Sequence, residues 1–244
     1  MAGWFRQLGK LAGPKVRKGR WLWTSLTGSR DEVTEAERAM GADMAAEIRR
    51  QVPAETDADV VGLVETVGGR VARAVADQTL RFHVEVLAGG EPNAFALPGG
   101  FVFVTRSLVE LCERREEELA FVVGHEMAHV IRGHALDRVL SDSATAAAVR
   151  AMPGRGALDA WVRHVGVRAL SAAYSRDREL GADALGARLA EAAGFGRDGA
   201  VRLLERLERL RAEGLAEALG LAGYFASHPP TAERIREVRN APPA

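Results

Sequence analysis

Two histidines and a glutamate lie close together in the middle of the chain, where residues 125–129 read His-Glu-Met-Ala-His. On an α-helix, residues four apart differ by only about 40° in direction, so His125 and His129 point to the same side, one turn apart. This arrangement suits two imidazole ligands of one tetrahedral zinc ion. Glu126 is turned by about 100° from His125, so it can reach a water molecule on the metal without being a ligand, as a general base must. The pattern predicts metal-assisted hydrolysis.

The residues around this motif indicate that it is buried. Residues 120–123 are Ala-Phe-Val-Val, and Val130 and Ile131 follow the second histidine. Two histidines and a glutamate in a buried helix are costly without a partner, and a metal ion is such a partner. The alternative is a chance match, because the five-residue pattern alone is only moderately specific.

A catalytic zinc site needs a third protein ligand. His134 follows the motif, but on a continuous helix it would point about 140° away from His129, so we predict a capping or packing role for it. Glu179 and Asp183 lie one turn apart on a predicted helix, where one carboxylate can bind the metal and the other can accept an imidazole N–H. Such a pair alone is more often a solvated helix face; the upstream histidines favour the metal role.

The remaining patterns predict an α+β fold, because helices come first, a few strands follow and further helices end the chain. Gly181 and Ala182 are small enough to let their helix approach the histidine helix closely. Apolar spacing predicts helices over 32–50, 57–78, 116–140, 157–172, 174–193 and 199–212, and a short one after Pro229-Pro230. Extended segments are predicted at Leu80–Leu87, Asn93–Leu97 and Phe101–Thr105, with glycine-containing turns between them.

Bulk composition narrows the class of protein. The chain has 244 residues, of which 47% are hydrophobic, as in a soluble globular domain. Cys112 is the single cysteine, which excludes an internal disulfide and a zinc site built from several thiolates. No apolar run reaches the roughly 18 residues that span a bilayer, and the N-terminus lacks the apolar core of a secretory signal. We therefore expect a cytoplasmic protein.

Residues 1–30 differ in composition from residues 31–240. They hold seven of the 33 basic residues and no acid, so the rest of the chain carries a net charge of −7. Trp4, Phe5 and Leu8 begin a pattern with helical spacing. We predict an N-terminal arm that packs on the acidic body. The alternative is an interfacial anchor that makes a peripheral membrane contact, and we expect no nucleic-acid partner.

The motifs together resemble the gluzincin metallopeptidase family of the CAAX prenyl proteases and HtpX-like heat-shock proteases. The likeness covers about residues 35–238 and rests on four ordered segments: HEMAH at 125–129, ELGAD at 179–183, NAFALPGG at 93–100 and SHPPTAERI at 227–235. It implies a zincin-like domain over residues 31–240, mostly helical, with a small mixed sheet of about three strands whose edge lies over the active-site helix.

The resemblance also implies roles for individual residues. One Zn²⁺ per chain would be held by His125, His129 and Glu179, with Glu126 as the base and Asp183 supporting a ligand. A polypeptide substrate in extended form would pair with the sheet edge at Asn93, Ala94, Phe95 and Ala96, unless that strand is internal to the sheet.

His228 and Arg234 are similar to the family's C-terminal motif, and a cationic side chain there would stabilise an oxyanion. Alternatively, His228 occupies the open metal position and silences the site, or it caps a helix before two prolines.

The sequence thus predicts a zinc endopeptidase that cuts within unfolded or extended polypeptides. Its rivals are a zincin-fold binding or chaperone-like protein with a silenced site, and a hydrolase of a non-peptide amide.

Overall fold

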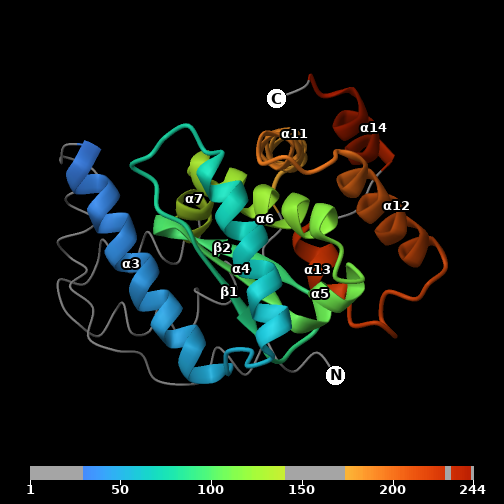
Figure 1. Ribbon diagram of the computed structural model, residues 1–244, viewed down its shortest axis with the longest axis horizontal. Helices are drawn as coiled ribbons and strands as arrows, with labels where there is room; N and C mark the ends of the chain where they lie inside the picture. The colour runs from blue at the N-terminus through green and yellow to red at the C-terminus, as the bar shows by residue number, and fades with distance from the viewer. Residues whose placement is uncertain (1–29, 141–173, 229–231, 243–244) are drawn as a thin grey trace.

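The computed structural model describes residues 30–140, 174–228 and 232–242 (Figure 1). The arm predicted at residues 1–30, apart from its last residue, and the helix predicted at 157–172 lie outside these ranges. Within them, no helix is both long enough and apolar enough to cross a membrane.

A three-stranded mixed sheet lies at the centre of the domain. It consists of β1 (His83–Leu87), β2 (Ala94–Leu97) and β3 (Phe101–Thr105), in the order β1-β3-β2. β1 runs parallel to β3, whereas β2 is antiparallel to it. The predicted α+β fold with a small mixed sheet is confirmed, and β2 lies at the end of the sheet among the described strands.

The turn between β2 and β3 requires glycine. Residues Pro98–Gly100 form a short 3₁₀ helix, η1, in which Gly99 has φ 76° and Gly100 has φ 92°. A Cβ atom on Gly99 would also lie 2.5 Å from the Cα of Arg38 in helix α3 (Arg30–Gln51). The turn therefore fixes how α3 crosses the end of the sheet.

Helices cover both faces of the sheet. On one face, Arg49 of α3 pairs with Glu85 of β1 and lies over the ring of Phe101. On the other face, Val84 packs against Gly68 of α4 (Ala58–Arg73), whose N-terminus is capped by the Asp57 side chain. α6 (Glu116–Ile131) packs on this second face, and its buried apolar residues join α4 and the sheet in the main core.

The single helix predicted over residues 116–140 is interrupted. α6 ends at Ile131, and α7 (His134–Leu140) begins after a break at Arg132 and Gly133. Gly133 adopts φ 72°, a left-handed conformation that commonly ends a helix and that glycine adopts without steric cost. The chain therefore changes direction just before His134.

The C-terminal helices complete the core around α6. Arg206 of α12 (Asp198–Ala212) donates to the Leu111 carbonyl and to the buried Glu118 carboxylate of α6, at 2.6 and 2.7 Å. This contact fixes the N-terminal end of α6 against α12. The helices here are α11 (Arg176–Ala192), α12 (Asp198–Ala212), α13 (Ala222–Ser227) and α14 (Ala232–Asn240), and α5 (Arg106–Leu111) follows β3. α5 and α13 were not predicted, because six residues are too few to show a helical period.

α6 and α11 cross in direct backbone contact. A Cβ atom on Gly124 would lie 2.6 Å from the Gly186 carbonyl oxygen, and one on Gly186 would lie 2.6 Å from the His125 nitrogen. Close approach of these helices was expected at Gly181 and Ala182. Ala182 is buried, but Gly181 faces the Arg132 side chain instead. The closest crossing thus lies at a pair of glycines beside the first histidine.

Adding one methyl group at this crossing is expected to separate the helices. Gly186→Ala should lower the free energy of unfolding by about 2–3 kcal/mol, because the new Cβ meets rigid backbone. Chemical denaturation measures the change. Gly62→Ala on α4 is the control, since nothing lies within 4 Å of its new Cβ, and there alanine should raise stability by up to about 1 kcal/mol. Equal stability of Gly186→Ala and the parent would contradict the crossing.

Candidate metal centre

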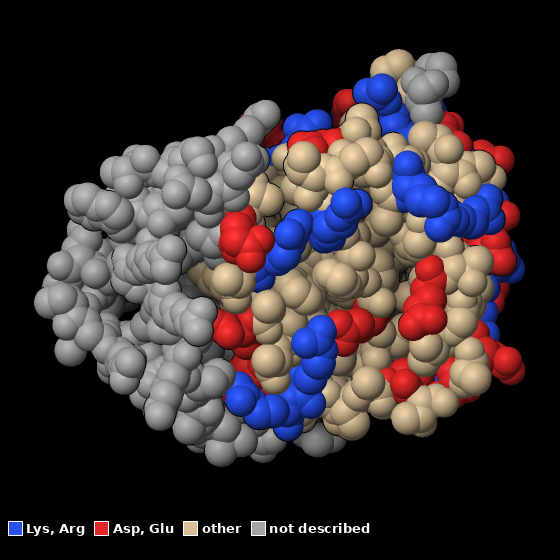
Figure 2. Space-filling model, turned by 60° about the vertical axis from the view of Figure 1, so that its left-hand side comes forward, with Lys and Arg blue, Asp and Glu red and all other residues tan. Residues whose placement is uncertain are grey.

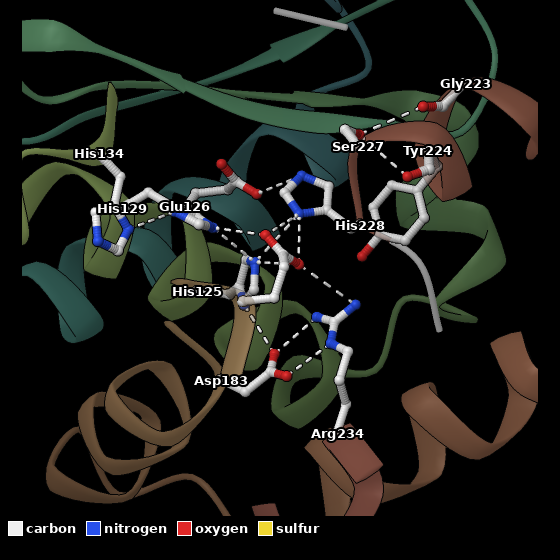
Figure 3. A network of polar contacts seen from close by, with 11 residues as sticks. His125, Glu126, His129, His134, Asp183, Gly223, Tyr224, Ser227, His228 and Arg234 are labelled. Carbon is white, nitrogen blue, oxygen red and sulfur yellow. Dashed lines mark hydrogen bonds and ion pairs between the residues drawn. The ribbon is translucent and has the colours of Figure 1, made fainter. Parts of the chain in front are cut away.

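Four buried side chains converge between α6, α11 and the end of α13 (Figure 3). They are His125 and His129 from α6, Glu179 from α11, and His228, which directly follows α13. One ligand atom from each lies within 4.8 Å of all the others, and none of the four residues is more than 3% exposed. The structure thus brings together the three predicted metal ligands and adds His228 to them.

The donor atoms face one another at distances that suit a shared cation. The Nε2 atoms of His125 and His129 lie 3.1 Å apart, and Glu179 Oε1 lies 3.2 Å from His129 Nε2. Two imidazole lone pairs and a carboxylate repel one another unless a proton or a metal ion lies among them. Neutral imidazoles and a carboxylate are also the donors that zinc prefers. The residues therefore fit a bound zinc ion.

The ionisation of these groups agrees with a metal site. Burial lowers the pKa of His129 to about 2, so its imidazole is neutral. Burial raises the pKa of Glu179, but the charges of His228 and His125 and the hydrogen bond with His129 outweigh it and hold that pKa well below the usual value. Burial lowers the pKa of His125, but the neighbouring carboxylates of Asp183 and Glu179 outweigh it and raise that pKa. A metal ion that binds here therefore competes with protons for the lone pairs of these groups.

Asp183 and Arg234 support the His125 side of the centre. Asp183 Oδ1 lies 2.9 Å from His125 Nδ1, on the side of the ring away from the other donors. Arg234 donates to both Asp183 oxygens, from Nε at 2.6 Å and from Nη2 at 2.7 Å, and its Nη1 lies 3.6 Å from Glu179 Oε2. Asp183 thus has the contact expected of it. Arg234 thus contacts both the supporting carboxylate and the carboxylate among the donors, and its predicted role in stabilising an oxyanion stays a prediction.

His129 has outer contacts that the sequence did not predict. Its Nδ1 lies 3.0 Å from Nδ1 of His134. The ring of Tyr174 stacks on the His129 ring at a centroid distance of 3.8 Å. The expectation that His134 points away from His129 is wrong, because Gly133 breaks the helix on which that geometry rests. Gly133 itself was the available signal, since glycine often follows the last residue of a helix. No comparable signal marks Tyr174.

Glu126 and His228 lie side by side next to the donor atoms. Glu126 is 2% exposed, and its Oε1 is 3.5 Å from His228 Nε2. His228 Nδ1 faces the donors, at 3.3 Å from His125 Nε2 and 3.1 Å from Glu179 Oε2. Its Nε2 is buried and makes no hydrogen bond within the described part of the chain. His228 therefore presents one nitrogen to the donors and the other to the space beside Glu126.

β2 packs against α6, as expected for a strand near the histidine motif. Its residues Ala94 to Leu97 and the preceding Asn93 are all buried, at no more than 6% exposure. The Asn93 carbonyl accepts the Thr105 N–H at 2.9 Å, which continues the pairing of β2 with β3. A substrate contact at Asn93, Ala94, Phe95 and Ala96 stays a prediction.

Comparison with known proteins places this arrangement in a family. The sequence model of Peptidase family M48 matches residues 61–241, which include all the donor residues. The chain belongs to this family. The resemblance to the gluzincin metallopeptidase family, noted in the sequence, is thereby confirmed.

Several curated proteases are similar to the chain. The mitochondrial metalloendopeptidase OMA1 of Schizosaccharomyces pombe is 34% identical over 164 residues, which cover 65% of this chain and 46% of OMA1. Metalloprotease YcaL of Escherichia coli is 29% identical over 161 residues, or 64% of this chain and 60% of YcaL. Protease HtpX of Nitrosococcus oceani is 30% identical over 195 residues, or 64% of each chain. The matches thus cover about half to two thirds of these relatives.

Removing the Arg234 guanidinium should weaken this M48 centre through Asp183. In Arg234→Met, the buried Asp183 carboxylate loses two hydrogen bonds and its counter-charge, which costs about 3–5 kcal/mol of stability. Denaturant unfolding of the metal-free protein measures this. Arg236→Met serves as the control, because that side chain is 63% exposed and, among the described residues, pairs only with Glu233, at 3.7 Å. Similar stability of the two variants would rule out the proposed support.

Proposed function

We propose that this M48 protein is a zinc-dependent endopeptidase with one zinc ion per chain. The observation that carries the proposal is the convergence of His125, His129 and Glu179 donor atoms beside the carboxylate of Glu126. A metal with three protein ligands and a neighbouring carboxylate is the arrangement of hydrolytic zinc sites. The names of the similar proteins, which are called metalloendopeptidases and proteases, support the same class of reaction.

In this proposal, Glu126 moves the proton. A zinc ion bound by His125, His129 and Glu179 supplies a Lewis acid that polarises the substrate carbonyl and makes water more acidic. Glu126 takes a proton from the attacking water and returns it to the leaving amine. His228 Nε2 lies 3.5 Å from Glu126 Oε1 and makes no other hydrogen bond in the described ranges, so it is free to donate to the oxyanion that forms.

The geometry of β2 supports an extended polypeptide as the substrate. Asn93 pairs with Thr105, so in this antiparallel ladder the alternate residues Phe95 and Leu97 also face β3. The backbone groups of Ala94 and Ala96 then point away from β3, toward the edge of the sheet. A substrate strand that pairs with these two residues would run along the edge of the strand that packs on α6.

The first test combines metal content with cleavage of an unfolded protein. We expect about one zinc per chain in the parent and in Glu126→Ala, with cleavage by the parent alone and loss of cleavage on chelation. Glu126→Ala should lower kcat by at least about 100-fold, because the proton acceptor is gone. Glu65→Ala, an exposed glutamate on α4, is the matched control.

Mass spectrometry of the digest then separates the classes of hydrolase. Internal fragments support an endopeptidase, whereas release of single terminal residues only would contradict it. Zinc without cleavage by the parent would point to the rival functions: a binding or chaperone-like protein, or a hydrolase of a non-peptide amide, which a substrate screen detects. Absence of zinc would refute the ligand assignment.

A second candidate, a silenced zinc protein, is favoured by the position of His228. Its Nδ1 lies 3.1–3.3 Å from donor atoms of His125 and Glu179, where a fourth ligand would lie. A fourth protein ligand closes a zinc site and leaves no position for substrate. Basic and acidic side chains of the described residues are interspersed on the face shown in Figure 2.

His228→Ala distinguishes the two functions. If His228 stabilises the oxyanion, the substitution should lower kcat about 100-fold with the zinc content unchanged. Steady-state cleavage of an unfolded substrate measures this, with His83→Ala, a histidine on β1, as the control. A rise in activity would instead assign His228 as the ligand that silences the site.

A further inference from the structure

We propose that His134 is a positioning residue for the metal: its neutral imidazole accepts the Nδ1 proton of His129 and thereby fixes the ring nitrogen that His129 turns to the zinc ion. The inference rests on the proposed zinc site. It begins from one contact, the 3.0 Å between the Nδ1 atoms of His129 and His134, both of which are buried (Figure 3).

The direction of this hydrogen bond follows from the other side of the His129 ring. His129 Nε2 lies 3.1 Å from His125 Nε2 and 3.2 Å from Glu179 Oε1, so Nε2 is the nitrogen that offers its lone pair to the metal. A neutral imidazole with a lone pair on Nε2 carries its proton on Nδ1. His129 must then donate, and Nδ1 of His134 must accept, with the His134 proton on its Nε2.

The two histidine ligands therefore have different outer partners. His125 Nδ1 lies 2.9 Å from the Asp183 carboxylate, which is charged and held by Arg234. His129 has a neutral partner in His134. Outer hydrogen bonds of this kind fix the tautomer and orientation of a ligand and contribute to metal affinity. His134 supplies for His129 the contact that Asp183 supplies for His125.

The fold holds His134 in this position by two independent features. The left-handed Gly133 turns the chain between α6 and α7, so that His134 faces back to His129 instead of away from it. One turn further along α7, Asp137 accepts a hydrogen bond from Arg178 of α11 at 2.7 Å, and Arg178 precedes the ligand Glu179. α7 is therefore tied to the helix that provides the third ligand.

Tyr174 limits the motion of the same ring from another direction. Its ring lies nearly parallel to that of His129, at 14° and a centroid distance of 3.8 Å. The stacking fixes the plane of the imidazole, and the hydrogen bond to His134 fixes its rotation within that plane. Loss of the His134 acceptor thus leaves the ring in place but removes the preference for the metal-binding tautomer.

Zinc affinity of the metal-free protein tests the inference without relying on activity. In competition with a chromophoric chelator, His134→Phe should weaken zinc binding about 10–100-fold, because the ring remains but the acceptor is lost. His134→Asn should bind zinc within about threefold of the parent, since its Oδ1 lies about where Nδ1 lies and also accepts. His83→Phe is the matched control: His83 stacks on Phe101 and, within the part of the chain that the structure describes, does not contact the zinc donors.

The outcomes separate this inference from the proposed function. Equal zinc affinity of His134→Phe and the parent overturns the inference alone, and so does an equal loss in His134→Phe and His134→Asn. Absence of zinc binding in the parent overturns both proposals. The melting temperature of each metal-free variant is compared as well, because a purely structural role would lower it for both substitutions. If His134→Phe does not fold, His134→Leu takes its place, with the same loss of affinity expected.

Discussion

The close crossing of α6 and α11 is the constraint on which the centre depends. Gly124 and Gly186 let the two backbones touch, and a side chain at either position would push them apart. Asp183 and Glu179 lie about one and two turns before Gly186 on α11, while His125 directly follows Gly124 on α6. The short carboxylate side chains therefore reach the imidazoles only because these helices meet without side chains between them.

Charge within the centre is balanced by a small number of buried pairs. Asp183 and Arg234 neutralise each other, with the pKa of Asp183 lowered because the nearby guanidinium outweighs the effect of burial. Glu179 then remains as the carboxylate that faces the histidine donors. A buried charge is costly unless it is paired, so a cation bound among these donors would stabilise the folded domain as well as supply its chemistry.

Residues that belong to a motif or share one face of a regular helix were predictable from the sequence. His125, His129, Glu179 and Asp183, which the structure brings together at the centre, were identified in this way, as was the three-stranded mixed sheet. The remaining contacts depend on helix breaks and on long-range packing, which the spacing of apolar residues does not reveal. Gly133 breaks a helix that apolar spacing alone would continue, and the glycine pair at the crossing is set by a partner about 60 residues away in the chain. The sequence also predicted an edge strand near α6, but it did not predict that this strand is almost completely buried.

The burial of the centre has a consequence for the lifetime of a bound metal. His129 is fully buried, and His125, Glu179 and His228 expose no more than 3% of their surface. Because these groups are shielded from solvent, we expect an ion held by them to exchange faster when the surrounding helices open locally. The dissociation rate of the ion would then report on the local opening of α6 and α11. Two variants of equal metal affinity would still differ in how long they retain the ion.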